Sequence, residues 1–457
     1  MIGRARVTDF RLDRRARLHV DGRGGLLVGG QPTRVLRLGL PAAQAVAGWR
    51  SGGAVRGGAE LRLAQRLHDA GLGLLRDEPR YGPQDVTVVV PARDRADDLR
   101  RCLASVGPCG RLLVVDDGSL DPDAVARTAA QGGAELVRRT TNGGPAAARN
   151  TGLAAARTPL VAFVDSDCTL PAGWLEGLLP GLLPGTVVVA PRVVGAGGPG
   201  LLQRFERGGG PLDLGRQAVP VRPGSRVGYL PAAVLVCARD DLGTGFDPCL
   251  RVGEDVDLIW RLVRAGHQVR YEPGVVVRHR TRVGFGGWVR QRHEYGRSAA
   301  LLDVRHPGAV TPLRWSRWSL PGLAAVASGR WGWAAVAVAA SAVGLRQRLP
   351  AGAGRHAEAT RLAVQGQGLT VLGLAQAVAR PWLPAALVLA VTSGRVRRLT
   401  AVAVVGQLAR AAPSRNRELD VLRWAVLQVA DDLAYASGVW RGAIELRRPG
   451  VLLPRLC

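Results

Sequence analysis

The stretch PLVAFVDSDC, residues 159–168, runs through apolar residues and ends in two aspartates, Asp165 and Asp167. A short apolar run bounded by polar residues is typical of a strand that is buried on both faces of a parallel sheet. The two aspartates fit either an ordinary capped turn at a strand end or a metal site for a phosphorylated substrate. The segments around this stretch decide between these alternatives.

Three further segments repeat the pattern of an apolar strand followed by a helix. DVTVVVPARDR (85–95) precedes ADDLRRCLASV, and RLLVVDDGSLD (111–121) precedes PDAVARTAAQ. AELVRRTTNGG (134–144) precedes PAAARNTGLAAA, in which Pro145 suits a first helical turn. Strands that alternate with helices predict an α/β fold with a mostly parallel sheet and right-handed crossovers.

Carboxylates follow the strands at one edge of this predicted sheet. Asp94, the pair Asp116 and Asp117, and the pair Asp165 and Asp167 each stand at the end of a strand. Ligands of open α/β sheets bind beyond the carboxyl ends of the strands. The repetition therefore favours a ligand site over a set of unrelated turn caps.

Two regions of different composition flank the α/β segment at 85–300. Residues 1–80 hold strand-like segments followed by helical ones, which predicts a small winged-helix-like module. Residues 310–457 are rich in Ala, Val, Leu and Trp, with uncharged runs bounded by arginines. The run at 331–345 would span about 22 Å as a helix, short of the roughly 30 Å hydrocarbon core of a bilayer. We expect helices that lie in a membrane interface or are buried in protein, and a helical domain packed on itself is the alternative.

The charge and the cysteines bear on partners and compartment. The chain has 62 basic residues, all of them arginine, against 36 acidic ones, for a net charge of +26. This excess favours nucleic acid or an anionic membrane, and the low aromatic content of 5% without a nucleic-acid motif makes us expect a membrane surface and no nucleic acid. The six cysteines lack metal-binding spacing, and the first twenty residues lack the apolar stretch of a secretory signal. We expect a protein with reduced thiols at the cytoplasmic face of the cell membrane, attached peripherally or integrally.

Five pieces of the α/β segment, taken in order, resemble the sequence pattern of family 2 glycosyltransferases of the GT-A fold. The pieces are VVVPARDR (88–95), VVDDGSLD (114–121), NGGPAAARNTG (142–152), FVDSDC (163–168) and VGEDVDLIWRLVRAG (252–266). Any one of them alone is weak, but the five in this order over about 85–300 are specific. The resemblance implies a sugar transferred from a nucleotide-sugar donor, with Mg²⁺ or Mn²⁺ at the diphosphate.

The resemblance also implies which residues hold the metal. Asp167 is the expected ligand, and Asp165 is expected to contact the metal or the donor ribose. Carboxylate oxygens are the ligands that these hard cations prefer. His279, at the end of EPGVVVRHR, completes the metal shell in some relatives, and a structural histidine is the alternative.

Other residues correspond to the donor-binding positions of the family. Asp117 resembles the carboxylate that binds uracil or ribose, with Asp116 before it as a structural residue. Pro91 and Ala92 would form the loop over the base. Asp94 is also expected to contact the donor, although it departs from the Tyr-Asn that often follows Pro-Ala in the family.

The remaining expected site residues come from three later segments. Arg149 and Asn150 would face the nucleotide from the helix after the glycine turn. Asp255, in GED, resembles the general base of an inverting transfer, and its neighbour Glu254 would be a helix-capping residue. Arg292, in QRHEYG (291–296), would meet the diphosphate, but the Trp of the pattern found in processive relatives is absent.

The order of module, catalytic segment and apolar tail resembles the glycosyltransferases of mycofactocin maturation. This implies UDP-glucose as the donor and premycofactocin, a small peptide-derived redox cofactor precursor, as the acceptor of one or several β-linked glucose units. The N-terminal module would recognise the acceptor or other mycofactocin maturation proteins.

Three alternatives remain at this point. The first is a family 2 enzyme with a lipid or cell-wall glycan acceptor. The second is a nucleotidylyltransferase, which would require a Gly-rich loop containing lysine after the first strand, whereas the chain has no lysine. The third is a non-catalytic sugar-nucleotide-binding membrane scaffold.

Overall fold

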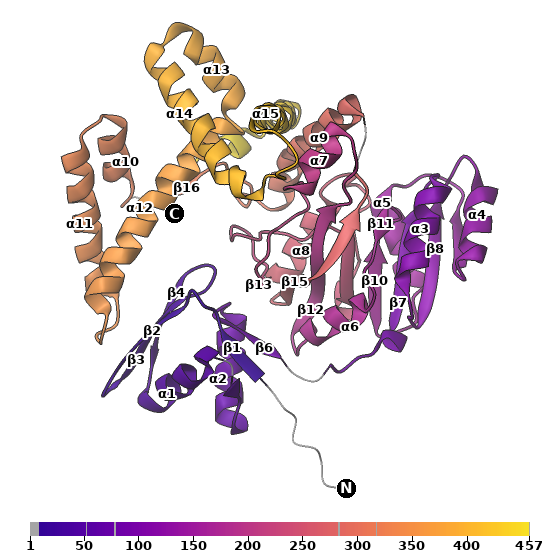
Figure 1. Cartoon of the computed structure of the whole chain (residues 1–457), viewed down its shortest axis with the longest axis horizontal. Coiled ribbons are helices and arrows are strands. Elements are labelled where there is room, and N and C mark those ends of the chain that lie inside the picture. Colours follow the sequence, from indigo (N-terminus) through magenta and orange to yellow (C-terminus); the bar gives the residue numbers. More distant parts are fainter. Residues whose placement is uncertain (1–8, 52, 77–78, 282–283, 317, 457) are drawn as a thin grey trace. The chain divides into compact units, whose positions relative to one another are not determined.

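The computed structural model describes residues 9–51, 53–76, 79–281, 284–316 and 318–456 (Figure 1). The chain forms two compact units. Of the described residues, the first contains Asp9, 74–76, 79–281 and Asn416–Glu418. The second contains 10–51, 53–73, 284–316, 318–415 and 419–456.

A nine-stranded, mostly parallel sheet forms the centre of the first unit. Its strands are β7 (Val86–Ala92), β8 (Arg111–Asp117), β9 (Glu135–Arg139), β10 (Leu160–Val164), β11 (Cys168–Thr169), β12 (Thr186–Gly195), β13 (Val219–Pro220), β14 (Val234–Ala238) and β15 (Gln268–His279). They follow the order β11-β15-β12-β14-β10-β7-β8-β9, and β13 pairs with β15. β10, β7, β8 and β9 run parallel, as do β12 and β15, whereas β14 is antiparallel to both β10 and β12.

The register of the parallel strands brings their carboxyl ends to one edge of the sheet. Ala92 on β7 pairs with Asp116 on β8, and Asp117 pairs with Arg139 at the end of β9. On the other side of β7, Phe163 pairs with Val89, so the turn after β10 begins beside the end of β7. The carboxylates that follow these strands are therefore neighbours in space.

Helices of the first unit pack on this sheet through apolar faces. They are α3 (Ala96–Val106), α4 (Pro122–Gln131), α5 (Pro145–Ala155), α6 (Trp174–Leu178), α7 (Leu201–Arg207) and α8 (Glu254–Arg264). The buried residues Leu99, Cys102, Leu103 and Val106 of α3 recur at helical spacing and join the core with the wholly buried β10. The predicted α/β fold with a mostly parallel sheet is confirmed.

The second unit combines a small N-terminal sheet with a helical region. Its sheet consists of the antiparallel strands β2 (Arg17–Asp21), β3 (Gly24–Gly29) and β4 (Arg34–Leu38). Residues 9–76 also contain the helices α1 (Leu40–Gly48) and α2 (Gly57–Asp69). The short strands β1 (Asp9–Leu12), β5 (Gly53–Ala54) and β6 (Gly73–Arg76) form a separate sheet in the order β5-β1-β6. The helical region holds α9 (Phe285–Arg305), α10 (Leu320–Ala327), α11 (Trp331–Arg348), α12 (Arg355–Ala379), α13 (Leu383–Thr392), α14 (Gly394–Ala411) and α15 (Val421–Glu445), with the paired strands β16 (Arg314–Trp315) and β17 (Arg455–Leu456).

Close packing of α9 against α15 organises this second unit. A Cβ at Gly438 of α15 would collide with the carbonyl oxygen of His293, and one at Gly296 of α9 would collide with that of Tyr435. The two backbones can approach so closely because both contact points are glycines. The predicted helical C-terminal region is confirmed, and 284–300 belong to the same unit as these helices.

α12 is long and apolar enough to cross a membrane by length and composition, and 22% of its most apolar window is buried. Exposed aliphatic side chains continue onto α13 and α14. They include Val364, Leu369, Leu372, Val388, Val391, Val402 and Val405. One such helix is weak support for membrane association, so the attachment predicted from the sequence stays a prediction.

Candidate active site

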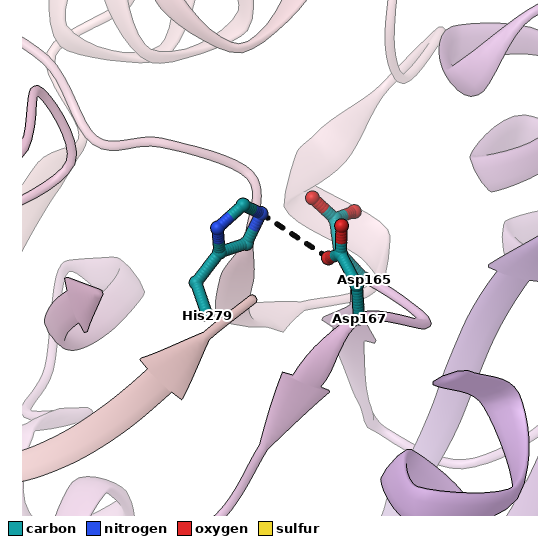
Figure 2. Close-up of side chains that lie close together, drawn as sticks. All are labelled: Asp165, Asp167 and His279. Atoms are coloured by element: carbon teal, nitrogen blue, oxygen red, sulfur yellow. Dashed lines mark ion pairs between the residues drawn. The ribbon is translucent and has the colours of Figure 1, made fainter. Parts of the chain in front are cut away.

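The turn after β10 brings Asp165, Asp167 and His279 together. β11 follows this turn and pairs with β15 so that Cys168 lies opposite His279. The potential ligand atoms of Asp165, Asp167 and His279 all lie within 4.8 Å of one another (Figure 2). His279 Nε2 is 3.2 Å from Asp167 Oδ1. In the sequence His279 lies 112 positions after Asp167, and the antiparallel pairing of β11 with β15 brings it to the two aspartates.

The chemistry of this cluster fits a divalent cation. Asp167 Oδ1 is buried and, apart from the ion-pair contact with His279, has no hydrogen-bond donor among the described residues. Burial acts to raise the pKa of Asp167, but His279 and the nearby Arg95 outweigh it and hold the pKa below its usual value. Burial acts to lower the pKa of His279, and the two aspartates outweigh it and raise the pKa. A carboxylate that stays ionised and lacks donors is a suitable ligand for Mg²⁺ or Mn²⁺.

Arg149 joins this cluster to the start of α8. Its side chain comes from α5, which begins at Pro145 after a left-handed Gly144 with φ of 86°. Arg149 is 3% exposed, and its Nη2 donates to Asp165 Oδ1 at 2.6 Å while its Nη1 donates to Glu254 Oε1 at 2.9 Å. The guanidinium carbon also lies 5.3 Å from the centre of the Phe246 ring. One buried cation thus contacts carboxylates from two distant segments.

Asp255 stands half-buried in the first turn of α8. Its Oδ2 accepts a hydrogen bond from the Ala232 amide at 3.2 Å, and its Oδ1 accepts one from the Val256 amide at 2.8 Å. Burial raises its pKa, against these two hydrogen bonds and Arg149. Burial and the charge of Asp255 raise the pKa of Glu254 to about 7, against the ion pair with Arg149. The geometry therefore separates Asp255, a half-buried carboxylate held by two backbone amides, from Glu254, a buried carboxylate paired with Arg149.

Asp117 holds the glycine turn that precedes α5. Its Oδ1 accepts from the Gly143 amide at 2.9 Å and from Arg139 Nε at 2.8 Å, and its Oδ2 accepts from the Gly144 amide at 2.7 Å. Asp116 is fully buried, and its Oδ2 has no hydrogen-bond donor among the described residues. The arrangement gives Asp117 a structural task in addition to the predicted donor contact.

Comparison with known proteins agrees with the geometry of this site. A model of the family described as "Glycosyl transferase family 2" matches 87–221. Two proteins named "Pre-mycofactocin glycosyltransferase", from two strains of Mycobacterium tuberculosis, are 41% identical to the chain over 469 aligned residues, which cover 97% of this chain and 97% of each relative. The chain belongs to glycosyl transferase family 2. It is a glycosyltransferase.

Other matches are less similar in sequence and cover less of the chain. The "Succinoglycan biosynthesis protein ExoU" of Rhizobium meliloti is 32% identical over 40% of this chain and 58% of its own length. A mannosyltransferase from Pyrobaculum calidifontis, solved in complex with GDP-Man and Mn²⁺, has a TM-score of 0.39 and 20% identity, covering 75% of this chain and 89% of its own. At such a TM-score the likeness supports no conclusion about ligands.

The other predicted donor-binding residues of this glycosyltransferase lie at the end of β7, in the loop after it, on α5 and on α9. Pro91 and Ala92 end β7, and Asp94 follows in a left-handed conformation with φ of 56°. Asp94 Oδ1 accepts from the Leu120 amide at 2.7 Å, which links the loop after β7 to the loop after β8. The Asn150 amide donates to the Phe246 carbonyl at 2.7 Å and accepts from the Phe246 amide at 2.8 Å.

Arg292 lies in the second unit, where α9 meets α15. It is 1% exposed, pairs with Asp431 of α15, and lies 5.3 Å from the centre of the Trp288 ring. These contacts give it a structural role within the second unit. Its predicted contact with the donor diphosphate stays a prediction.

Sequence reasoning missed two features of the site in this family 2 glycosyltransferase. Arg95, whose φ is 53°, places Nη1 3.9 Å from Asp167 Oδ2. Residues other than glycine with a left-handed backbone cluster at functional sites. Arg gives no sign in the sequence that its backbone will adopt this conformation. The link from Arg149 to Glu254 was also missed, because a separation of 105 positions carries no local pattern.

Proposed function

We propose that this glycosyltransferase transfers glucose from UDP-glucose to premycofactocin, in an inverting reaction that can be repeated to add several β-linked units. The observation that carries the acceptor is the similarity to the Pre-mycofactocin glycosyltransferases, which extends over 97% of both chains at 41% identity. Similarity over the flanking regions as well as the catalytic segment favours a shared acceptor over a lipid or cell-wall glycan. Membership of an enzyme family and the cluster of Asp165, Asp167 and His279 favour catalysis over a scaffold role.

The metal would be held by Asp165, Asp167 and His279, whose ligand atoms already lie within 4.8 Å of one another. When bound, Mg²⁺ or Mn²⁺ supplies positive charge to the diphosphate that leaves with the uridine. Arg149 orients Asp165 through its 2.6 Å hydrogen bond. Pro91, Ala92, Asp94, Asp117, Asn150 and Arg292 are the other residues proposed to contact the donor.

Asp255 is the proposed general base. Its carboxylate takes the proton from an acceptor hydroxyl while that oxygen attacks C1 of the glucose. The bond from C1 to the diphosphate oxygen breaks on the opposite face, and UDP leaves with the bonding electrons. One carboxylate is sufficient, since no covalent sugar–enzyme intermediate forms. A pKa raised by burial makes Asp255 a better proton acceptor than an ordinary aspartate.

The test is the intact mass of the product formed from UDP-glucose, Mn²⁺ and premycofactocin, with a lipid extract as the competing acceptor. The proposal expects the mass of premycofactocin to increase by whole hexose units. Labelled glucose that appears only in the lipid fraction would support the lipid-acceptor alternative instead.

We also propose that the exposed aliphatic side chains of α12, α13 and α14 rest on the anionic cytoplasmic face of the membrane. Val388 and Val391 of α13 are 70% and 80% exposed, and the chain has a net charge of +26. Apolar burial and attraction to anionic lipids act together in such binding. Co-sedimentation with vesicles containing phosphatidylglycerol should fall for the double variant Val388→Glu, Val391→Glu. The matched control is Leu136→Glu on β9, and equal binding by both variants would refute this surface.

A further inference from the structure

A closed ring, made of four hydrogen bonds and two pairs of adjacent residues, connects the metal-binding turn to the proposed base. Arg149 donates to both Asp165 and Glu254, and Glu254 is followed in α8 by Asp255. The Ala232 amide donates to Asp255 Oδ2 at 3.2 Å, and the Ala233 carbonyl accepts from the Asp165 amide at 2.9 Å. The ring thus returns to Asp165 through two adjacent residues of one loop.

The members of this ring are held from outside as well. Arg149 Nη2 also lies 3.5 Å from the Ala232 carbonyl. Phe246, against which the guanidinium packs, is fixed through its backbone by both groups of the Asn150 amide, and its ring meets Phe163 of β10 edge-on at 5.1 Å between centroids. A buried side chain with its hydrogen bonds and its packing surface fixed has little freedom to move.

From this ring we infer that Glu254 and Arg149 are a positioning pair, which fixes the distance between Asp255 and the donor end of the site. The inference rests on the proposed function, because it assumes that Asp255 is the base. Glu254 does not touch the reacting atoms in this account. It is buried, and its Oε1 faces Arg149 at 2.9 Å. The buried guanidinium of Arg149 thus lies between two carboxylates, with Nη1 bonded to Glu254 and Nη2 bonded to Asp165.

The pair has a direct consequence for catalysis. Asp255 must meet the acceptor hydroxyl at the moment when C1 lies in line with the leaving diphosphate. A misplacement of about 1 Å can cost on the order of 10²-fold in rate. Loss of the pair should therefore lower kcat, while the donor, which binds at the turn of Asp165 and Asp167, should still bind.

The experiment compares Glu254→Ala and Glu254→Gln with the wild type. We expect Glu254→Ala to lower kcat by about 10- to 100-fold and to leave the KM for UDP-glucose within about twofold, the pattern of a lost transition-state interaction. Glu254→Gln keeps an amide oxygen for Arg149 Nη1 and should recover most of kcat. The matched control is Glu135→Gln, which alters an ion pair with Arg111 at the opposite end of the same sheet and should leave kcat unchanged.

Several outcomes would overturn the inference. A wild-type kcat in Glu254→Ala removes the positioning role. A parallel fall in kcat, UDP affinity by calorimetry and unfolding temperature indicates general structural damage. Equal inactivity of Glu254→Gln and Glu254→Ala points to a direct role of the Glu254 charge in proton transfer.

A double variant covers the case in which a single variant does not fold. Arg149→Met with Glu254→Leu replaces a buried ion pair by apolar side chains of similar size, which is often tolerated. We expect the double variant to fold and to have a lower kcat than the wild type. A double variant with the wild-type kcat contradicts the inference. If the wild type glucosylates another acceptor, the proposed acceptor fails but the same comparison on that acceptor still decides the role of Glu254. A wild type without any transfer overturns both.

Discussion

Replacement of Asp255 by asparagine isolates its proposed role as the base. Asparagine keeps the shape of the side chain and one carbonyl oxygen, but it cannot accept a proton at neutral pH. Loss of a general base typically costs about 10²- to 10⁴-fold in rate. We therefore expect kcat of Asp255→Asn to fall by about 10²- to 10⁴-fold.

The structure also predicts the effect of this change on stability. Asp255 accepts hydrogen bonds from the amides of Val256 and Ala232 at its two oxygens. Asparagine has one acceptor, so one amide loses its partner, at a cost of about 1–3 kcal/mol. Removal of a carboxylate whose pKa is raised by burial offsets part of this cost. The net change in unfolding free energy should be smaller than the loss in activation free energy.

Initial rates at saturating UDP-glucose, together with calorimetric titration of UDP in the presence of Mn²⁺, measure the two effects separately. The control is Asp257→Asn, in the same helical turn, where the residue bonds Arg261 at 2.8 Å. We expect this control to retain its kcat. The reasoning is refuted if Asp255→Asn keeps a kcat comparable to that of the wild type, or if it loses UDP binding in proportion to its activity.

Three further predictions concern the metal, a buried ion pair and a buried acid. Asp167→Asn should raise the Mn²⁺ concentration needed for half-maximal activity by at least the roughly 10- to 100-fold typical of outer-shell changes, and an unchanged Mn²⁺ titration would contradict the metal site. Arg292→Met should lower the unfolding free energy by about 3–5 kcal/mol, because Asp431 loses the nearer of its two cationic partners and keeps only Arg380 at 3.9 Å; urea unfolding measures this, and lost UDP binding at unchanged stability would favour the donor role instead. Burial raises the pKa of Asp432 to about 6 against the attraction of Arg380. A raised carboxyl pKa means that the folded state binds more protons, so stability should fall as pH rises from about 4 to 6, and Asp432→Asn should gain up to about 3 kcal/mol at pH 7 but nothing below pH 4 in urea unfolding; an equal difference at every pH would refute it.

The sequence was sufficient to predict the sheet and its active edge. Uniformly apolar strands such as LVAFV can only be buried, and the helices between them require parallel pairing. Parallel strands place their carboxyl ends together, so Asp117 and Asp165 were expected at the same edge of the sheet, while the order of the strands was not predicted. The metal cluster needed one further fact, the antiparallel pairing of Cys168 with His279, which no local pattern specifies.

Contacts over long separations could not be predicted. The ion pair between Arg149 and Glu254 depends on where α8 begins relative to the sheet, and the sequence of α8 fixes only its apolar face. The left-handed backbone at Asp94 and Arg95 was likewise not predicted, because Arg does not favour this conformation and Asp adopts it in only a minority of positions. The position of Arg292 could not be predicted from the sequence either, since the glycines that bring α9 against α15, Gly296 and Gly438, lie 142 positions apart.

The central claim is that this site moves glucose from UDP-glucose to a hydroxyl of premycofactocin with inversion at C1. The most direct test is the NMR spectrum of the purified product of UDP-glucose, Mn²⁺ and premycofactocin, read at the anomeric proton, with an EDTA-treated reaction as the control. The account predicts a β-linked glucose on the peptide-derived acceptor and no product with EDTA. An α-linked product, or product formed equally well in EDTA, would contradict it.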